Sequence, residues 1–361
     1  MRQGNAIGLA PVAGAIIESG QPLVGAARAC LGITMEKGTT TDDEEERGRH
    51  RSWLRTVGMI VLILLLLVVI LLGGVGWYAS GRAIHPKQNV YDWSMSDYPN
   101  LKPEPVTFKT RDGVTLAGRF FPGSSKTTII LSHGYGDDQD QMIPWADFLN
   151  RAGFSVFTYD MRERGQSGGD AVTLGAKGQT DLVSAVDYLV TRPDVDPDRI
   201  GALGVSLGAS VTILGAARDT RIRAVVDDSG FSAASNVIAT SFQKFLHVPA
   251  FPFAPITVKI AEWRAGADVN HVQPVKVIGS ISPRPIFIIH GTADTLVPPQ
   301  NSERNFAAAR QPKEIWWVPG AGHVEARTLD PNDYQLRVIQ FFHQSLDVSV
   351  AETAARAATP S

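Results

Sequence analysis

The sequence predicts an α/β fold in which helices flank a mostly parallel central sheet. From about residue 105 to residue 346, short apolar runs that suit buried strands alternate with segments of helical period. Several of these runs end in loops that combine glycine with serine, aspartate or histidine. An uncharged stretch before residue 80 adds one transmembrane helix ahead of this domain.

The composition limits the partners and cofactors that we expect. The chain has 361 residues, 44% of them hydrophobic, which is enough for one large core with appendages. A formal net charge of -2 gives no support for a nucleic-acid surface. Cys30 is the single cysteine, so no intramolecular disulfide can form, and no Cys/His cluster has the spacing of a zinc site. We therefore expect no metal and no organic cofactor.

Residues 1–55 do not have the pattern of a packed domain. Alanine and glycine dominate up to Gly32, and an acidic run at Asp42–Glu46 is followed by several arginines. Blocks of like charge are usually solvated, so we predict a disordered cytoplasmic segment. Met35 is an alternative start of the chain.

No charged residue occurs between Arg55 and Arg82, and this stretch can cross the ~30 Å hydrocarbon core as a helix. We predict a transmembrane helix over residues 56–79, with residues 57–78 in the bilayer and an aromatic pair, Trp77 and Tyr78, at its interface. A signal peptide cleaved near Ala79 is the alternative. Against it, the apolar core is longer than the usual ~7–15 residues.

Lys and Arg residues are more numerous before this span than shortly after it. The positive-inside rule therefore predicts a single-pass protein of the cell membrane, with a cytoplasmic N-terminus and the following domain on the extracytoplasmic side. The cations counted for this rule are Lys37, Arg47, Arg49, Arg51 and Arg55 before the span, and Arg82 and Lys87 after it.

Residues 80–104 contain several prolines and no clear period, and we expect an extended tether.

A regular pattern covers residues 105–346. A hairpin with a turn at Arg111-Asp112-Gly113 opens it, strands and helices then alternate, and a cap insertion at about 231–284 interrupts the alternation. Residues 347–361 are small and polar, and we expect a disordered tail. The predicted strands are Val106–Thr110, Val114–Phe121, Thr127–Ser132, Phe154–Tyr159, Ile200–Val205, Ile222–Asp227, Pro285–Ile289 and Glu314–Val318, and the predicted helices are Gln141–Arg151, Gly178–Thr191, Ala209–Ala217, Asn301–Arg310 and Asp330–Leu346.

The apolar run from Ile200 ends in Gly204-Val205-Ser206-Leu207-Gly208, and a helix of small residues follows. A serine on a sharp turn between strand and helix is held in a strained conformation, so its neighbours must be small. Gly204 and Gly208 meet this requirement. Ser206 is therefore the candidate nucleophile.

Two later strands end in loops that supply the partners of a serine nucleophile. One loop carries Asp294, and the other carries His323. Functional groups collect at the carboxyl ends of strands in open α/β sheets, and the chain order serine, acid, histidine accompanies this kind of turn. Asp228, which follows the strand after Ser206, is an alternative acid.

Pro105–Leu346 resembles the α/β-hydrolase fold and is most similar to single-domain serine hydrolases related to dienelactone hydrolase and to the prolyl-oligopeptidase catalytic domain. Many such proteins carry Arg-Gly directly after the Asp-x segment, whereas this chain has the longer Arg162-Glu163-Arg164-Gly165. That departure concerns a loop and not the candidate triad. The matching pieces are Arg111-Asp112-Gly113, His133-Gly134, Asp160-Met161-Arg162 with Gly165 and Ser167, Gly204 to Gly208, His290 to Asp294 with Val297-Pro298, and Gly322-His323.

Chemistry assigns each candidate a role. Ser206 is too weak an acid to attack a carbonyl unaided, and His323 has the pKa range of a base that later returns the proton to the leaving group. Asp294 would hold the imidazole tautomer and stabilise the imidazolium. The developing oxyanion needs two backbone N–H donors, which we assign to Leu207 and to Tyr135, with Gly136 as the alternative to Tyr135.

Within the cap, Phe251 and Phe253 lie in a proline-rich stretch that cannot form a regular helix. One interpretation is that the apolar residues of the cap only pack it onto the core. The sharper hypothesis is that Phe251 and Phe253 bind substrate by lining an apolar acyl pocket, or that they touch the bilayer that the anchor keeps close.

These features predict a membrane-anchored serine hydrolase that cleaves carboxylic esters or thioesters of small molecules or lipids through an acyl-enzyme intermediate. A peptidase of the prolyl-oligopeptidase type and an acyltransferase are alternatives, because both use the same acyl-enzyme. A tethered binding module that has lost activity is the non-enzyme alternative.

Overall fold

The computed structural model describes residues 40–242, 244 and 249–346 of the chain. Its centre is an eight-stranded sheet with the strand order β1-β2-β4-β3-β5-β6-β7-β8. The order reverses around β3, so the chain runs first toward one edge of the sheet and then toward the other. The strands are β1 (Glu104–Lys109), β2 (Thr115–Phe121), β3 (Thr128–Ser132), β4 (Ser155–Tyr159), β5 (Ile200–Val205), β6 (Ile222–Asp228), β7 (Ile286–Gly291) and β8 (Lys313–Val318).

The sheet is mostly parallel, as the sequence predicts. β2 pairs antiparallel with β1 and β4, and every other neighbouring pair is parallel. The β1–β2 turn contains Gly113 at φ +89°, a left-handed conformation that favours glycine. All eight strands lie within two residues of their predicted bounds. The carboxyl ends of β3, β5, β6, β7 and β8 consequently share one edge of the sheet.

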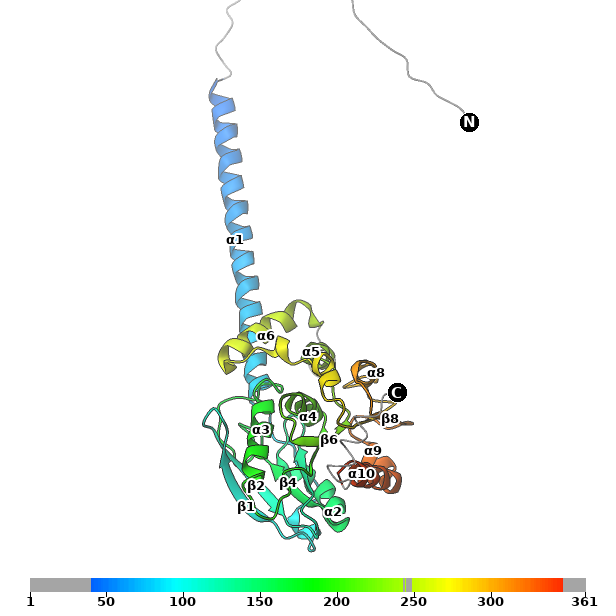
Figure 1. Cartoon of the computed structure of the whole chain (residues 1–361). Helices are drawn as coiled ribbons and strands as arrows, with labels where there is room; N and C mark the ends of the chain where they lie inside the picture. Colours follow the sequence, from blue (N-terminus) through cyan, green and yellow to red (C-terminus); the bar gives the residue numbers. More distant parts are fainter. Residues whose placement is uncertain (1–39, 243, 245–248, 347–361) are drawn as a thin grey trace, which may run out of the picture. The chain divides into compact units, whose positions relative to one another are not determined.

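Helices cover both faces of the sheet, because consecutive strand side chains point to opposite sides. Ile130 and Ala202 face a core with α3 (Gly178–Leu189), α4 (Leu207–Arg218) and the segment around α8 (Gln300–Ala308). Ile129 and Leu203 face a second core with α2 (Ile143–Arg151) and α10 (Pro331–Leu346). Figure 1 shows α3 and α4 on one side of the strands and α2 and α10 on the other. The short elements on these faces are η2 (Gln139–Met142) and α9 (Ala326–Leu329).

The segment between β6 and β7, where the sequence predicts a cap, is largely helical. Its longest helix, α6, is interrupted at Phe251, whose φ of −92° and ψ of 134° are not helical. Figure 1 shows α5 and α6 outside the layer formed by α4. The elements of the segment are α5 (Ala234–Ser241), α6 (Ala250–Ala265), η4 (Val269–His271), α7 (Pro274–Val277) and η5 (Ile278–Ser280).

The N-terminal helix α1 (Thr40–Ile84) is longer than the predicted span in both directions. Residues 40–55, predicted to be disordered, are helical, and Glu45 and Arg49, four residues apart on this part of the helix, form an ion pair at 3.9 Å. Among the described residues, α1 is the one helix long and apolar enough to cross a membrane. The predictions for residues 1–39, including Met35, and for residues 347–361 lie outside the described residues.

Residues 80–104 differ from the predicted extended tether. The first five of them complete α1, and the rest follow the surface of the domain with a short helix η1 (Met95–Asp97). Leu101 is buried in the core shared by α2 and α10, and Trp93 Nε1 donates to the Asp140 carbonyl at 3.1 Å. Isolated apolar residues anchor this segment, and they are too few to produce a period in the sequence.

Candidate active site

Ser206 lies on the turn between β5 and α4 with φ 55° and ψ −115°, a conformation that L-residues rarely adopt. The two glycines of the motif make this turn possible. A Cβ atom at Gly204 would lie 2.2 Å from the Gly208 backbone, and one at Gly208 would lie 2.0 Å from the Ser132 carbonyl oxygen. The Ser206 N–H donates to the Asp228 carbonyl at 2.8 Å, which fixes the strained residue to β6.

The structure brings the three predicted catalytic side chains together. Ser206 Oγ lies 2.8 Å from His323 Nε2, and His323 Nδ1 lies 2.7 Å from Asp294 Oδ2. Asp294 is buried, whereas His323 is partly exposed. Since a carboxylate accepts from Nδ1–H, the imidazole nitrogen that faces Ser206 is left free to accept a proton.

Asp294 is held by the loop that carries it. Its Oδ1 atom accepts hydrogen bonds from the N–H groups of Leu296 and Val297, each at 2.9 Å. His290 lies beside it, but His290 Nε2 is 2.8 Å from the Val297 carbonyl and its Nδ1 is 2.7 Å from Ser302 Oγ. His290 Nε2 also lies 3.4 Å from Asp294 Oδ2, so this buried imidazole packs against the Asp294 carboxylate and supports the loop that carries it.

The alternative acid, Asp228, forms no hydrogen bond or ion pair with His323. It is fully buried, and its carboxylate accepts from Tyr334 Oη at 2.8 Å and from Ser229 Oγ at 2.9 Å. Burial raises the pKa of Asp228 to about 6. Asp228 therefore has a structural role next to the Ser206 turn.

Leu207, the first residue of α4, and Tyr135, on the loop after β3, border the nucleophile. Among the described residues, neither the Leu207 N–H nor the Tyr135 N–H makes a hydrogen bond.

His133 is buried two residues before Tyr135. Burial lowers the pKa of His133 to about 4, so this imidazole is neutral near pH 7. His133 Nδ1 lies 2.8 Å from the Gly134 carbonyl, and its Nε2 accepts from the Met161 N–H at 3.0 Å. His133 thus shapes this loop as a neutral imidazole near pH 7.

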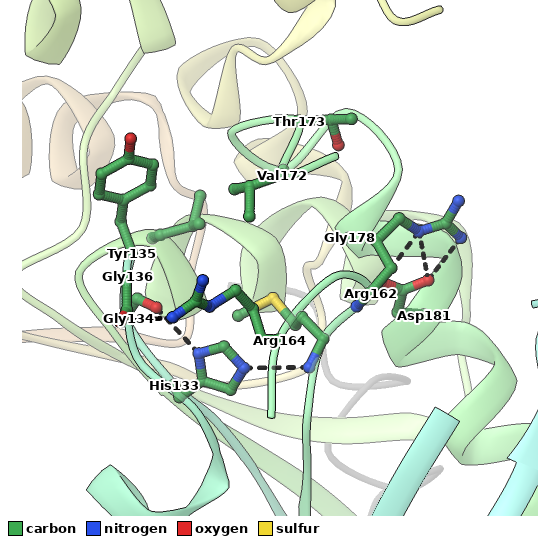
Figure 2. Close-up of a pocket in the computed structure, with 13 residues that line it drawn as sticks. His133, Gly134, Tyr135, Gly136, Arg162, Arg164, Val172, Thr173, Gly178 and Asp181 are labelled. Atoms are coloured by element: carbon green, nitrogen blue, oxygen red, sulfur yellow. Dashed lines mark hydrogen bonds and ion pairs between the residues drawn. The ribbon is translucent and has the colours of Figure 1, made fainter. Parts of the chain in front are cut away.

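A small pocket opens beside these two loops. Figure 2 shows His133 and Arg164 on one side of it and the paired Arg162 and Asp181 on the other. The side chains of Ser206, His323 and Asp294 do not line it, so it adjoins the nucleophile through Leu207. Its lining residues are His133, Gly134, Tyr135, Gly136, Met161, Arg162, Arg164, Val172, Thr173, Gly175, Gly178, Asp181 and Leu207.

The structure keeps Phe251 and Phe253 apart from this pocket. Phe251 is 79% exposed on α6, and Phe253 is partly exposed. The acyl-pocket hypothesis therefore has no support from their position. The exposed side chain of Phe251 is free to contact a molecule other than this chain.

Two arginines in the loop after β4 were not assigned roles from the sequence. Arg162 forms ion pairs with Asp181 at 2.5 Å and with Asp112 at 2.8 Å, and the hydrogen bond from Arg162 lowers the pKa of Asp112. Arg164 donates to three backbone carbonyls around the loop that carries Tyr135. The unusual Arg-Glu-Arg-Gly sequence was the signal that could have drawn attention to them.

No group of three or more His, Cys, Asp or Glu side chains that could hold a metal ion occurs within residues 40–242, 244 and 249–346.

Comparisons with known proteins agree with this fold. The chain is 32% identical over 240 residues to the uncharacterized protein YfhR of Salmonella typhi, covering 62% of this chain and 75% of that protein. A polyketide transferase of Stachybotrys chlorohalonatus is 26% identical, with 61% of this chain and 90% of that protein covered. The solved esterase Pf2001 of Pyrococcus furiosus is 28% identical with a TM-score of 0.60, over 72% of this chain and 99% of that one. The prolyl oligopeptidase family matches residues 146–349. With its α/β-hydrolase fold, the chain belongs to the prolyl oligopeptidase family.

Proposed function

We propose that the chain is a membrane-anchored serine hydrolase that cleaves carboxylic esters or thioesters through an acyl-enzyme. The observation that carries the proposal is the hydrogen-bonded series from Ser206 through His323 to Asp294. Similarity to a solved esterase supports an ester substrate over an amide. The substrate class is an acyl ester of a small molecule or a lipid.

The reaction follows from the direction of these hydrogen bonds. His323 Nε2 takes the Ser206 hydroxyl proton while Oγ bonds to the acyl carbon, and the imidazolium formed is stabilised by Asp294. As the tetrahedral intermediate collapses, the carbon–oxygen bond to the leaving group breaks and His323 gives that group its proton. Water then repeats the sequence on the acyl-enzyme, releasing the acid and restoring Ser206.

The oxyanion requires donors that are already in position. The N–H of Leu207, at the start of α4, and the N–H of Tyr135 are the groups we assign, with Gly136 as the alternative to Tyr135. The helix N-terminus at Leu207 also favours negative charge beside Ser206. Loss of one such donor typically costs ~10²–10³ in kcat.

The membrane part of the proposal rests on α1 and its surroundings. The apolar side chains of α1 are exposed, as a lipid-facing helix requires, and the excess of Lys and Arg before the span favours a cytoplasmic N-terminus in the cell membrane. The hydrolase domain would then lie on the extracytoplasmic side. The test is a C-terminal fusion to a reporter that works only in the cytoplasm. Activity of that reporter would contradict this orientation.

The cap supports a position of the domain close to the bilayer. α6 packs against the end of α1 so closely that a Cβ at Gly76 would lie 2.9 Å from Ile256 and Ile260. The rings of Trp77 and Trp263 lie 6.2 Å apart, and Trp263 is mostly exposed. Exposed aromatic side chains beside the end of an apolar span suit the membrane interface. We propose that Phe251, on the same helix α6, contacts lipid rather than an acyl pocket.

Two related activities share the acyl-enzyme. Membership of the prolyl oligopeptidase family favours a peptidase, and similarity to a polyketide transferase favours transfer of the acyl group to an alcohol. The ester hydrolase differs from both in the bond cleaved or in the acceptor, so a substrate panel separates them. An inactive tethered module would react with none of these substrates.

The test is a panel of acyl esters, acyl thioesters and peptides assayed with the full chain in detergent, together with labelling by a fluorophosphonate. We expect ester or thioester turnover and labelling that Ser206→Ala abolishes, and we expect neither to change in the matched surface variant Ser96→Ala, because Ser96 is exposed. Full ester hydrolysis by Ser206→Ala would refute the assignment. Turnover confined to peptides would favour the peptidase.

A further inference from the structure

The segment that joins the membrane helix to the domain lies against the loop that carries Tyr135. We call residues 82–91 the strap and residues 133–138 the oxyanion loop. The Asn89 N–H donates to the Gly136 carbonyl at 3.0 Å, and Tyr135 Oη donates to the Ala83 carbonyl at 2.8 Å. The contact is tight, since a Cβ at Gly136 would lie 3.2 Å from the Lys87 carbonyl oxygen.

Side chains of the strap converge on one buried carboxylate of the oxyanion loop. Asp137 Oδ1 accepts from Asn89 Nδ2 at 2.5 Å and from Tyr91 Oη. Burial and the neighbouring Asp137 raise the pKa of Tyr91, so its hydroxyl stays a donor throughout any practical assay range. The next residue of the domain, Asp138, accepts from Gln88 Nε2. The strap therefore supplies the donors that this carboxylate uses.

Arg164 connects the strap to the oxyanion loop. Its guanidinium donates to the Gly136 carbonyl at 2.8 Å, to the Asp137 carbonyl at 3.0 Å and to the Pro86 carbonyl at 2.9 Å. Figure 2 shows this guanidinium beside Gly134 and Gly136. A buried guanidinium that donates to carbonyls of two segments fixes their spacing, because its donors form a rigid planar fork.

We infer that the strap is a positioning element of the active site: through Asp137 and the Gly136 carbonyl it holds the oxyanion loop, and with it the Tyr135 N–H, at the distance that catalysis needs. The inference rests on the proposed function. An oxyanion donor acts only when it is in place before charge develops, so a loop held by His133 and Arg164 without the strap would supply it less well. Asn89 and Tyr91 are positioning residues, since neither touches the Ser206 turn.

The test uses the full chain in detergent with a soluble short-chain nitrophenyl ester. In Asn89→Ala and Tyr91→Phe we expect kcat to fall by about tenfold with KM within twofold, less than the ~10²–10³ of a missing donor because the donor is displaced and not removed. Val90→Ala is the matched control in the same segment, since Val90 is 95% exposed, and its kcat should not change.

Two further readouts separate positioning from stability. Hydrogen exchange should speed up in residues 133–138 of both strap variants while their unfolding midpoints stay near that of Val90→Ala. Because Asn89 acts through Asp137, adding Asn89→Ala to Asp137→Ala should lower kcat little further. Unchanged kcat, or losses that equal the fraction of protein failing to label, would overturn the inference. Ester hydrolysis that persists in Ser206→Ala would instead remove the proposed function, and the inference with it.

Discussion

Asp294→Asn should inactivate the enzyme because of the direction in which the new amide must turn. Asp294 Oδ1 accepts two backbone N–H groups, from Leu296 and Val297, whereas Oδ2 accepts one hydrogen bond from His323 Nδ1. The asparagine carbonyl keeps the two backbone donors, so its NH₂ group faces His323. Two N–H groups cannot face one another, and the imidazole proton moves to Nε2, which lies 2.8 Å from Ser206 Oγ.

In that tautomer His323 cannot accept the serine proton. We expect kcat on a short ester to fall by about 10⁴, the size of loss that the wrong tautomer causes in a serine protease, which corresponds to about 5 kcal/mol of transition-state stabilisation. KM should change little, because Asp294 is buried away from substrate. The measurement is steady-state hydrolysis with active-site titration, so that losses of folded protein are counted separately.

Asp228→Asn is the matched control for this prediction. Asp228 accepts hydrogen bonds from Tyr334 and Ser229. The asparagine carbonyl can accept one of them, and its NH₂ group can donate to the other hydroxyl, whose oxygen then acts as acceptor. We expect less than about a tenfold loss of kcat, since no hydrogen bond of His323 is altered. Near-normal activity in Asp294→Asn, combined with a loss of about 10³ or more in Asp228→Asn, would refute the reasoning and assign the acid to Asp228.

Three further predictions address the turn, the buried imidazole and the cap. Gly208→Ala places a Cβ 2.0 Å from a β3 carbonyl oxygen, and we expect little soluble folded protein; a wild-type unfolding midpoint would contradict this. The pKa of His133 is about 4 in the folded chain and 6.5 in the unfolded chain, so protonation favours the unfolded chain. Between pH 6.5 and pH 4, the free energy of unfolding measured in urea should therefore fall by about 3 kcal/mol more for the wild type than for His133→Gln. Parallel pH curves for the two proteins would disprove this. Phe251→Ser and Trp263→Ser should slow hydrolysis of vesicle-embedded long-chain esters but not of soluble ones, unlike the exposed control Leu336→Ser; equal effects of all three would rule out a membrane-facing cap.

The sheet could be predicted from the sequence because its strands are continuous apolar runs. Residues such as Ile129 and Ile130 are buried on opposite faces, so no alternation is needed to recognise their strand. The meeting of Ser206, Asp294 and His323 was predictable for a related reason. Each follows a strand directly, and parallel topology carries strand ends to one edge. Asp228 also follows a strand, and only side-chain geometry separates it from Asp294.

The bounds of α1 were harder to predict from hydrophobicity. A search for an apolar span stops at charged residues, whereas the helix continues through the acidic and basic residues before Arg55 because their side chains suit helix surfaces. The exposure of Phe251 was also hard to predict. A large aromatic side chain favours burial, but Phe251 lies at an interruption in α6 and is exposed.

The strap shows why the rest could not be read from local pattern. Gln88, Asn89 and Tyr91 look like linker residues, since what gives them a role is a pair of carboxylates 46 to 50 positions further along the chain. A fragment that begins at Pro105, the start suggested by the periodic pattern, would keep Ser206, Asp294 and His323 but lose every strap contact to the oxyanion loop. Low activity of such a fragment would therefore be expected even if the catalytic assignment is correct. The substrate of this protein should be sought with the strap and α1 in place, because the strap contacts the loop that carries Tyr135.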